Sequence, residues 1–184
     1  DAKRGDIGTT AEKYATALFN LGFDMVTVNP YLGFDSIKPF IEDEEKGVFI
    51  LCLTSNPSSK DFQYLKIEGE YLYQKVAKKV KEWNRKGNCG LVVGATHPEE
   101  LKSIRDLAPE LVFLIPGIGA QGGNLESAVI DGTDDNYTMA VINSSRGILY
   151  ASPDTDFARA AREKAKKLQT DINLIIQKHK QKNQ

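Results

Sequence analysis

Short β-branched segments alternate with amphipathic segments of helical period along all 184 residues of the chain. Parallel strands need a crossover connection that is usually a helix, so this alternation is typical of βα units around a parallel sheet. The predicted strands are an opening stub over residues 1–6 and the segments 25–28, 48–53, 91–93, 112–115 and 139–142. The predicted helices cover residues 11–21, 35–41, 71–86, 98–107, 124–130 and 155–178, and Thr9 or Thr10 is expected to cap the first of them.

Unusual polar or glycine-rich segments follow the carboxyl ends of the predicted strands, at residues 1–6, 29–33, 54–56, 94–96, 116–123 and 143–147. An open doubly wound sheet gathers its ligand residues at one switch point, whereas a (βα)8 barrel recruits them from nearly every strand end. The loops therefore predict an α/β protein with the (βα)8 TIM barrel fold. Six βα units indicate that units 3–8 are present and that the first two are missing. Residues 1–184 are thus expected to form a single domain, the C-terminal three-quarters of a barrel.

Composition and charge argue against several classes of partner. The formal net charge of −1 provides no field that favours nucleic acid or an anionic membrane, and no apolar run approaches the roughly 18 residues of a spanning helix. We therefore expect no nucleic-acid partner, no membrane partner and a cytoplasmic location. Cys52 and Cys89 fit neither a zinc site nor a disulfide framework, and His97 and His179 are too far apart to indicate a metal site.

The opening segment Asp1-Ala-Lys3-Arg-Gly-Asp6 places two acids and a lysine within six residues. Residues i and i+2 of a strand share a face, so Asp1 and Lys3 point the same way, while Asp6 lies past the strand end. The result is an acid, a base and a second acid at the mouth of a sheet. A solvated salt-bridge cluster explains such a motif equally well when it is seen alone.

Two loops late in the chain have the composition of a phosphate site. The glycine-rich segment 116–123 follows the second-to-last strand, and the segment 143–147 follows the last strand. In (βα)8 barrels these two loops frequently bind phosphate through backbone N–H groups. Gln121 offers an amide donor, and Arg146 offers a permanent charge whose fork suits phosphate oxygens. Together the loops predict a phosphate site, with the glycine-rich segment as a candidate lid.

Six motifs occur in a characteristic order between residues 1 and 151: Asp-Ala-Lys-Arg-Gly-Asp-Ile, Thr-Val-Asn-Pro-Tyr-Leu-Gly, Leu-Thr-Ser-Asn-Pro, Val-Val-Gly-Ala-Thr, Pro-Gly-Ile-Gly-Ala-Gln-Gly-Gly and Asn-Ser-Ser-Arg-Gly-Ile. In these motifs the chain resembles the orotidine 5′-phosphate decarboxylase family, particularly its longer bacterial and protozoan branch. The resemblance implies a (βα)8 barrel that acts as a homodimer. It also implies a carboxy-lyase of pyrimidine nucleotide synthesis that converts orotidine 5′-phosphate to UMP and carbon dioxide without metal or organic cofactor.

The resemblance also implies catalytic roles for the opening motif. Lys3 matches the group that stabilises and protonates the pyrimidine C6 carbanion, and Asp1 matches the carboxylate placed against the substrate's own carboxylate. Asp6, with Ile7 and Thr10, matches a segment that reaches across the dimer interface into the neighbouring site. The family's lysine at the end of an earlier strand and its early-strand aspartate that contacts the ribose have no counterpart in this sequence.

The resemblance implies substrate contacts at the later loops. Ser55 and Asn56 lie where the family binds the pyrimidine edge, and their individual roles stay open because the turn can be aligned in two ways. Pro116 matches a position beside the ring. Gln121, Arg146 and the backbone of Ser145 match phosphate contacts.

Two other hypotheses remain open on the sequence. A related barrel acts on sugar phosphates, as a decarboxylase or an aldolase, and shares the acid-lysine-acid motif but stabilises an enediolate with magnesium. A chain that lacks two barrel units could also bind a nucleotide phosphate while being catalytically incomplete.

Overall fold

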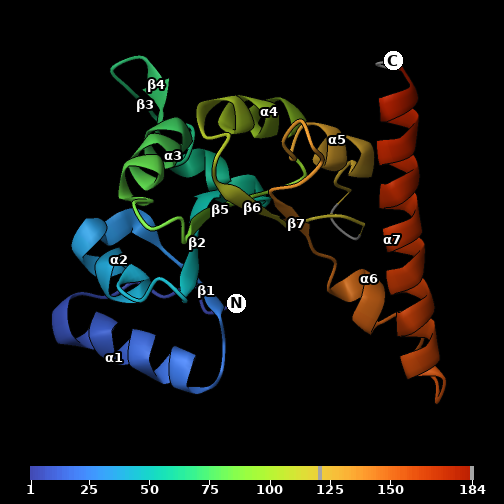
Figure 1. Cartoon of the computed structure of the whole chain (residues 1–184), viewed down its shortest axis with the longest axis horizontal. Coiled ribbons are helices and arrows are strands. Elements are labelled where there is room, and N and C mark those ends of the chain that lie inside the picture. Colours follow the sequence, from blue (N-terminus) through green and yellow to red (C-terminus); the bar gives the residue numbers. More distant parts are fainter. Residues whose placement is uncertain (120–121, 183–184) are drawn as a thin grey trace.

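The computed structural model describes residues 1–119 and 122–182 and contains, within them, one five-stranded parallel sheet. Its strands are β1 (Met25–Val28), β2 (Gly47–Leu53), β5 (Cys89–Val93), β6 (Val112–Ile115) and β7 (Ala140–Ile142), and they lie side by side in that order (Figure 1). In a doubly wound sheet the order of the strands reverses at a switch point, whereas the wall of a (βα)8 barrel keeps its strands in chain order. The order confirms the predicted barrel fold, here as a partial barrel.

The opening stub adds a sixth position to this wall without forming a regular strand. Arg4 makes a parallel bridge with Val28, in which the Arg4 N–H donates to the Thr27 carbonyl over 3.2 Å and the Asn29 N–H donates to the Arg4 carbonyl over 2.6 Å. The predicted strand over residues 1–6 is therefore wrong in extent, although its place beside β1 is right. Lys3 explains the interruption, because its φ of +46° lies outside the extended region.

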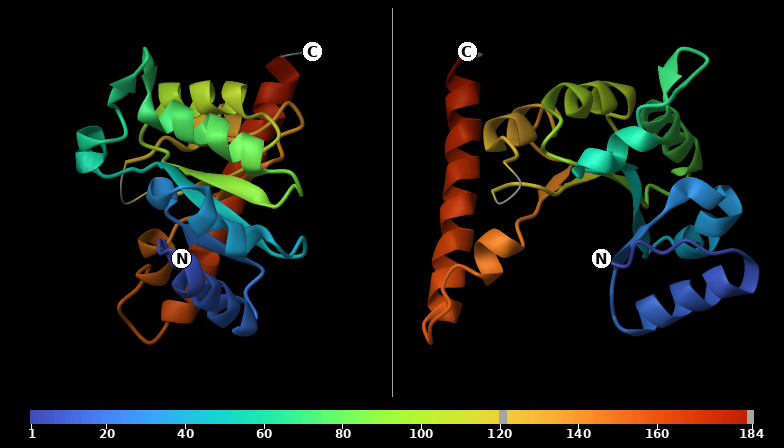
Figure 2. Two further views of the ribbon diagram at one scale, coloured as in Figure 1. Left: turned by 90° about the vertical axis from the view of Figure 1, so that its left-hand side faces the viewer. Right: turned by 180° about the vertical axis from the view of Figure 1, so that it is seen from behind.

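Helices cover the outer face of the sheet, and Figures 1 and 2 show α1 to α5 in chain order around its curve. Their bounds are α1 (Gly8–Asn20), α2 (Phe34–Ile41), α3 (Leu72–Trp83), α4 (Pro98–Leu107), α5 (Leu125–Ile130), α6 (Arg146–Leu149) and α7 (Phe157–Lys182). All of the predicted helices are present, and the four-residue α6 is an addition. The predicted cap is wrong: the N-cap of α1 is Ile7, which makes no side-chain cap, so Thr9 and Thr10 lie inside the first turn.

The predicted loop between β2 and α3 contains local structure. A 3-10 helix, η2 (Pro57–Asp61), leads into a small antiparallel hairpin formed by β3 (Lys66–Ile67) and β4 (Glu70–Tyr71). The two turn residues, Glu68 and Gly69, have φ values of +54° and +84°. A type I′ hairpin turn requires positive φ at both central residues, which Gly69 adopts without strain and Glu68 adopts at a cost. A second 3-10 helix, η1 (Pro30–Leu32), follows β1.

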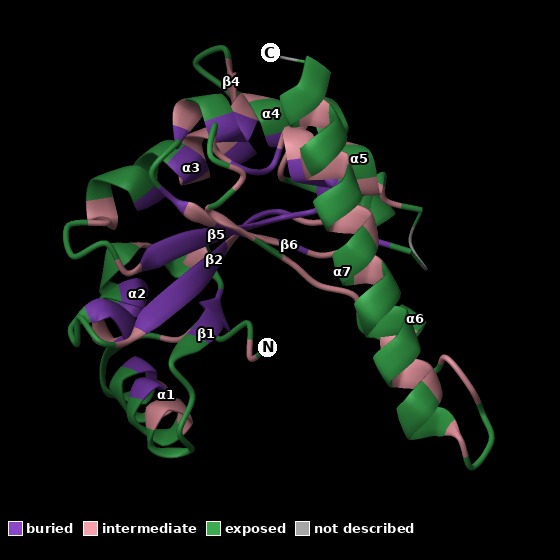
Figure 3. Cartoon of the chain, turned by 45° about the vertical axis from the view of Figure 1, so that its right-hand side comes forward, coloured by how far each residue is buried: buried purple, intermediate pink, exposed green. Residues whose placement is uncertain are grey.

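Side chains of the strands alternate between the helices and the barrel interior. Ile50, Leu91 and Phe113 lie in register on adjacent strands and are fully buried against the helices. Their neighbours Leu51, Val92 and Leu114 are also in register and face a cavity inside the barrel wall. Both faces of the central strands are therefore covered, one by helices and the other by the cavity walls. Strand β5 is accordingly buried throughout its length (Figure 3).

Helix α7 has no buried residue, which it shares with the short α6, and it lies alongside α5 and α6 (Figure 3). Its half-buried Leu168 packs against the edge of the core. Nowhere in residues 1–119 or 122–182 does a helix combine the length and apolarity needed to cross a membrane.

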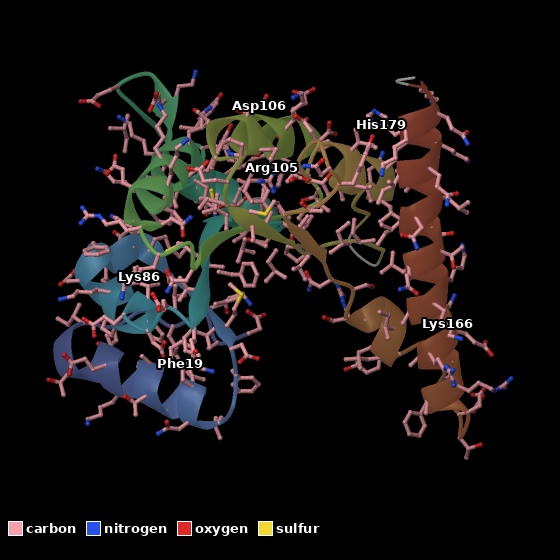
Figure 4. All side chains as sticks on the ribbon, in the orientation of Figure 1. Phe19, Lys86, Arg105, Asp106, Lys166 and His179 are labelled. Atoms are coloured by element: carbon pink, nitrogen blue, oxygen red, sulfur yellow. The ribbon has the colours of Figure 1, made fainter. Side chains whose placement is uncertain are left out.

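The side chain of Arg105 on α4 links backbone segments at the amino end of the sheet (Figure 4). The side chain is 6% exposed, lies 3.6 Å above the Phe113 ring and donates six hydrogen bonds to backbone carbonyls. The accepting residues are Ala108, Pro109, Leu111, Gly132 and Met139. Burial lowers the pKa of Arg105 to about 10, so the guanidinium is still charged at neutral pH.

Candidate active site

A cavity of about 510 Å³ opens at the carboxyl ends of the strands. Cavities of this size accept small organic ligands. The cavity brings together most of the residues singled out from the sequence: Asp1, Lys3, Ser55, Asn56, Pro116, Ser145 and Arg146. They come from the opening stub and from the loops after β2, β6 and β7, so several strand ends contribute to this cavity.

Asp1 and Lys3 form the acid-base end of the cavity. The Lys3 ammonium forms an ion pair with Asp1 Oδ2, and Thr27 Oγ1 donates a 2.7 Å hydrogen bond to Asp1 Oδ1. The same Thr27 hydroxyl accepts a 2.8 Å bond from the Lys3 N–H. One hydroxyl therefore fixes the position of the acid and the backbone of the base.

Thr27 is a site residue that the sequence did not reveal. It lies in β1, is 4% exposed and lines the cavity. A β-branched threonine in the strand Met-Val-Thr-Val fits a half-buried strand by propensity alone, so nothing in the local pattern sets it apart. The available signal was its polarity within an otherwise apolar strand that ends near the opening motif in the predicted sheet.

Stability does not explain the arrangement at Lys3. The side chains of Lys3 and Asp1 are 50% and 64% exposed, and exposed ion pairs contribute only about 0 to 1 kcal/mol. The backbone of Lys3 has positive φ, which is unfavourable for a residue with a side chain. A strained lysine held by an acid and a buried hydroxyl is typical of a functional position.

The loop after β2 forms a second wall. Thr54, Ser55 and Asn56 all line the cavity. Gly94, at the end of β5, packs directly against this loop: a Cβ atom there would lie 3.0 Å from both the Cβ and the backbone nitrogen of Ser55. Glycine at this position therefore lets the two strand ends approach closely enough to hold Ser55 against the cavity.

The loops after β6 and β7 form the end that was predicted to bind phosphate. Gly117, Gly119 and Gly122 have φ values of +103°, +86° and +77°, so this loop adopts a path that other residues rarely follow. Arg146 is exposed and lines the cavity beside Ser145. Among the described residues, the buried Oδ1 of Asn143 accepts no hydrogen bond, although Asn143 lines the same end. The predicted contact Gln121 lies outside the described residues.

Asp6, Ile7 and Thr10 lie outside the cavity that residues 1–119 and 122–182 form. Asp6 Oδ1 accepts a 2.8 Å bond from the Ile7 N–H at the entry to α1, and the Ile7 side chain is 59% exposed. The three residues therefore do not line the cavity that the described part of their own chain forms. Their predicted contribution to a neighbouring site stays a prediction.

The described part of the chain contains no group of three or more histidine, cysteine, aspartate or glutamate residues arranged to hold a metal ion. Cys52 and Cys89 are both buried and unpaired, and burial raises the pKa of Cys89 to about 11. Neither cysteine lines the cavity formed by the described residues.

Comparison with known proteins points to one family. A family model described as orotidine 5′-phosphate decarboxylase / HUMPS matches residues 1–161. A protein of Dehalococcoides mccartyi named orotidine 5′-phosphate decarboxylase is 55% identical over 178 residues, which cover 94% of this chain and 66% of the relative. A protein of the same name from a Janthinobacterium species is 52% identical, over 96% of this chain and 66% of the relative. The chain thus spans 66% of the length of these curated relatives.

Solved structures give the same assignment. The OMP decarboxylase of Leishmania donovani matches with a TM-score of 0.84 and 44% identity, over 95% of this chain and 66% of that one. The UMP synthase of the same organism matches with a TM-score of 0.86 and 46% identity, over 95% of this chain and 38% of that one. The predicted resemblance is confirmed, and the chain belongs to the orotidine 5′-phosphate decarboxylase / HUMPS family.

Proposed function

We propose that the protein converts orotidine 5′-phosphate to UMP and carbon dioxide, as a carboxy-lyase of pyrimidine nucleotide synthesis. The observation that carries the proposal is the single cavity that joins the Asp1–Lys3 pair to the loop bearing Arg146. A nucleotide has its phosphate at one end and its base at the other, and the cavity offers a permanent cation at one end and an acid-base pair at the other. The curated relatives at 55% and 52% identity carry the name of this enzyme.

The proposed reaction explains why a lysine stands at the base end. When the bond from C6 to the carboxylate carbon breaks, carbon dioxide leaves and the electron pair stays on C6 in an orbital in the ring plane. The ring cannot delocalise that pair, so stabilisation must be electrostatic. The Lys3 ammonium, paired with Asp1, supplies the positive charge and then transfers its proton to C6, forming the C–H bond of UMP.

Asp1 has two effects in this proposal. Its carboxylate forms an ion pair with the Lys3 ammonium, the group that stabilises the carbanion and donates the proton. It would also lie against the carboxylate of the substrate and raise the energy of the bound ground state. Thr27 holds Asp1 in place for both roles.

The remaining cavity residues provide binding. Arg146, the Ser145 backbone and Gln121 would hold the phosphate, Pro116 would lie beside the ring, and Ser55 and Asn56 would meet the pyrimidine edge. Phosphate binding far from C6 can be used to hold the base in the arrangement that the reaction requires. Because phosphorylated nucleotides do not cross membranes unaided, we place the activity in the cytoplasm.

We further propose a homodimer in which Asp6, Ile7 and Thr10 of each protomer contribute to the neighbouring site. An exposed isoleucine beside an acid, on a segment that does not line the cavity formed by the described residues of its own chain, supports this arrangement. Sedimentation of the full-length protein tests it: the Ile7→Arg variant should sediment as a monomer and lose turnover. A wild-type protein that is monomeric and active would contradict the proposal.

The magnesium-dependent alternative is less well supported, because the curated relatives at 50–55% identity carry the decarboxylase name. A chelator separates the two. Orotidine 5′-phosphate decarboxylation by the full-length protein should be unchanged in excess EDTA, whereas loss of activity that magnesium restores would favour the alternative.

Lys3→Ala provides the direct test in the full-length protein. Carbon dioxide release should fall by at least about 1,000-fold, because both the stabilising charge and the proton donor are lost. UMP binding, measured by calorimetry, should survive. Lys164→Ala, an exposed lysine on α7, is the matched control and should leave turnover unchanged. Near-normal turnover of Lys3→Ala would show that the assigned proton donor is wrong.

A further inference from the structure

A chain of three hydrogen bonds leads from the loop after η2 to the cavity. Gln63 Oε1 accepts a 2.8 Å bond from the Thr54 backbone N–H, and Gln63 Nε2 donates a 2.8 Å bond to Thr54 Oγ1. Thr54 Oγ1 in turn donates a 2.7 Å bond to Asn56 Oδ1. Thr54 and Asn56 line the cavity, whereas Gln63 lies behind them. We call these three residues the Gln63 relay.

The direction of the Gln63 relay follows from its first bond. A backbone N–H can only donate, so the oxygen of the Gln63 amide must face Thr54 and its NH2 group must face the Thr54 hydroxyl. That hydroxyl accepts from Gln63, so its single proton is available for Asn56 and must meet the oxygen of the Asn56 amide. The NH2 group is then what Asn56 can offer to a ligand.

Gln63 is held firmly enough to impose this direction. Its N–H donates to the Ser59 carbonyl over 2.8 Å, and its carbonyl accepts from the N–H of the buried Tyr73 over 3.1 Å. The adjacent Tyr64 donates a 2.8 Å bond to Glu100 on α4. The segment is therefore anchored to η2, α3 and α4, so bonds within the chain itself hold the relay in order.

We infer that the Gln63 relay sets the base specificity of the site by presenting Asn56 Nδ2 as a hydrogen-bond donor to a ring carbonyl of the pyrimidine. This inference rests on the proposed function and deepens it. Uracil and orotate carry a carbonyl acceptor at C4, whereas cytosine carries an amino donor there. A fixed donor forms a hydrogen bond with the C4 carbonyl of uracil and orotate, and it repels the amino group of cytosine. Gln63 is thus a positioning residue, and Asn56 is the group that it orients.

Gln63→Glu tests the inference, because a carboxylate can only accept hydrogen bonds. One oxygen keeps the bond from the Thr54 N–H, and the other takes the Thr54 hydroxyl proton away from Asn56. The hydroxyl can then only accept from Asn56, so the amide turns its oxygen toward the cavity. In the full-length protein, the ratio of the dissociation constants of CMP and UMP should fall by at least about tenfold, since UMP binds more weakly and CMP more tightly.

Three controls separate this effect from other causes. Gln74→Glu makes the same change on α3, away from the cavity, and should leave the ratio at its wild-type value. Ribose 5-phosphate, which has no base, should bind wild type and Gln63→Glu equally. Thr54→Val breaks the relay without adding charge and should bring the ratio close to one, whereas Thr54→Ser should restore it.

The outcomes also distinguish this inference from the proposed function. A wild-type protein that fails to bind UMP would contradict the proposed function. A second outcome would overturn the inference alone. In it, the wild type binds UMP better than CMP, and folded Gln63→Glu and Thr54→Val variants keep the wild-type ratio of the two dissociation constants. If Gln63→Glu does not fold, the Thr54→Val and Thr54→Ser pair decides the question.

Discussion

The two ends of the parallel sheet each carry an arginine, and the two arginines are used in opposite ways. Arg105, at the amino end, is 6% exposed and donates six hydrogen bonds to backbone carbonyls of the described residues. Arg146, at the carboxyl end, is exposed and lines the cavity. An arginine whose donors are already used stabilises the fold, whereas one whose fork faces a cavity is suited to an anionic ligand.

The comparison extends to the polar groups around each arginine. At the amino end, the carbonyls around Arg105 are satisfied by its guanidinium, which also packs against the Phe113 ring. At the carboxyl end, within the described residues, the buried Oδ1 of Asn143 accepts no hydrogen bond and Lys3 has a strained backbone. Barrel enzymes separate stability at the amino face from chemistry at the carboxyl face, and this chain follows that division.

The largest expected effect on stability concerns the amino end of the sheet. Arg105→Leu leaves several buried carbonyls without donors, so the free energy of unfolding should fall by at least about 3 kcal/mol. Urea denaturation of the full-length protein measures the change. Arg162→Leu, an exposed arginine on α7, is the matched control and should shift stability by no more than about 0.5 kcal/mol. Equal stability of the two variants would break the comparison.

A smaller effect is expected at the carboxyl end. Arg146→Ala should weaken the binding of UMP by about 100-fold, because a charge-assisted hydrogen bond to phosphate contributes roughly 1.5 to 3 kcal/mol. The free energy of unfolding should not change, since the side chain is exposed. Calorimetric titration and urea denaturation on the same preparation check both statements. A variant that loses stability but keeps its affinity would reverse the assignment of the two ends.

The smallest effect sharpens the comparison, because Thr27 is buried and yet belongs to the carboxyl end. Thr27→Val keeps the shape and removes the hydroxyl that joins Asp1 to the Lys3 backbone. Turnover should fall by about tenfold, corresponding to roughly 1.4 kcal/mol, while the affinity for UMP stays within about twofold. Thr27→Ser keeps the hydroxyl and should retain most of the turnover. If Thr27→Val lowers stability alone, Thr27 belongs with Arg105 as a purely structural residue.

Much of the fold could be predicted because the pattern of apolar residues is local. The segments 25–28 and 112–115 were placed with their observed bounds, and α4 was predicted from Pro98 to Leu107 as observed. The prediction was wrong where local strain decided the structure. Lys3, with positive φ, ends the opening strand, and Glu68 and Gly69 form a tight turn within what the sequence presents as a polar loop.

The candidate site could be predicted only in part, for a similar reason. Lys3 and Arg146 carry charges in loops at strand ends, so they are visible in sequence. Thr27 and Gln63 have neutral side chains of ordinary type, and their importance depends on partners 24 and 9 residues away. Such partners are chosen by the packing of β1 and η2, which no local pattern specifies.

The alternation of strands and helices, the parallel sheet in chain order and the family can all be inferred from the sequence alone. These depend on hydrophobic period and on motifs, which are properties of short segments. Three features depend on the folded structure. The Thr27 hydroxyl bonds to both Asp1 and Lys3, and the Arg105 guanidinium donates to carbonyls of five residues. The Gln63 relay fixes the orientation of the Asn56 amide. Hydrogen bonds are directional and short, so they exist only once distant segments have been brought within about 3 Å.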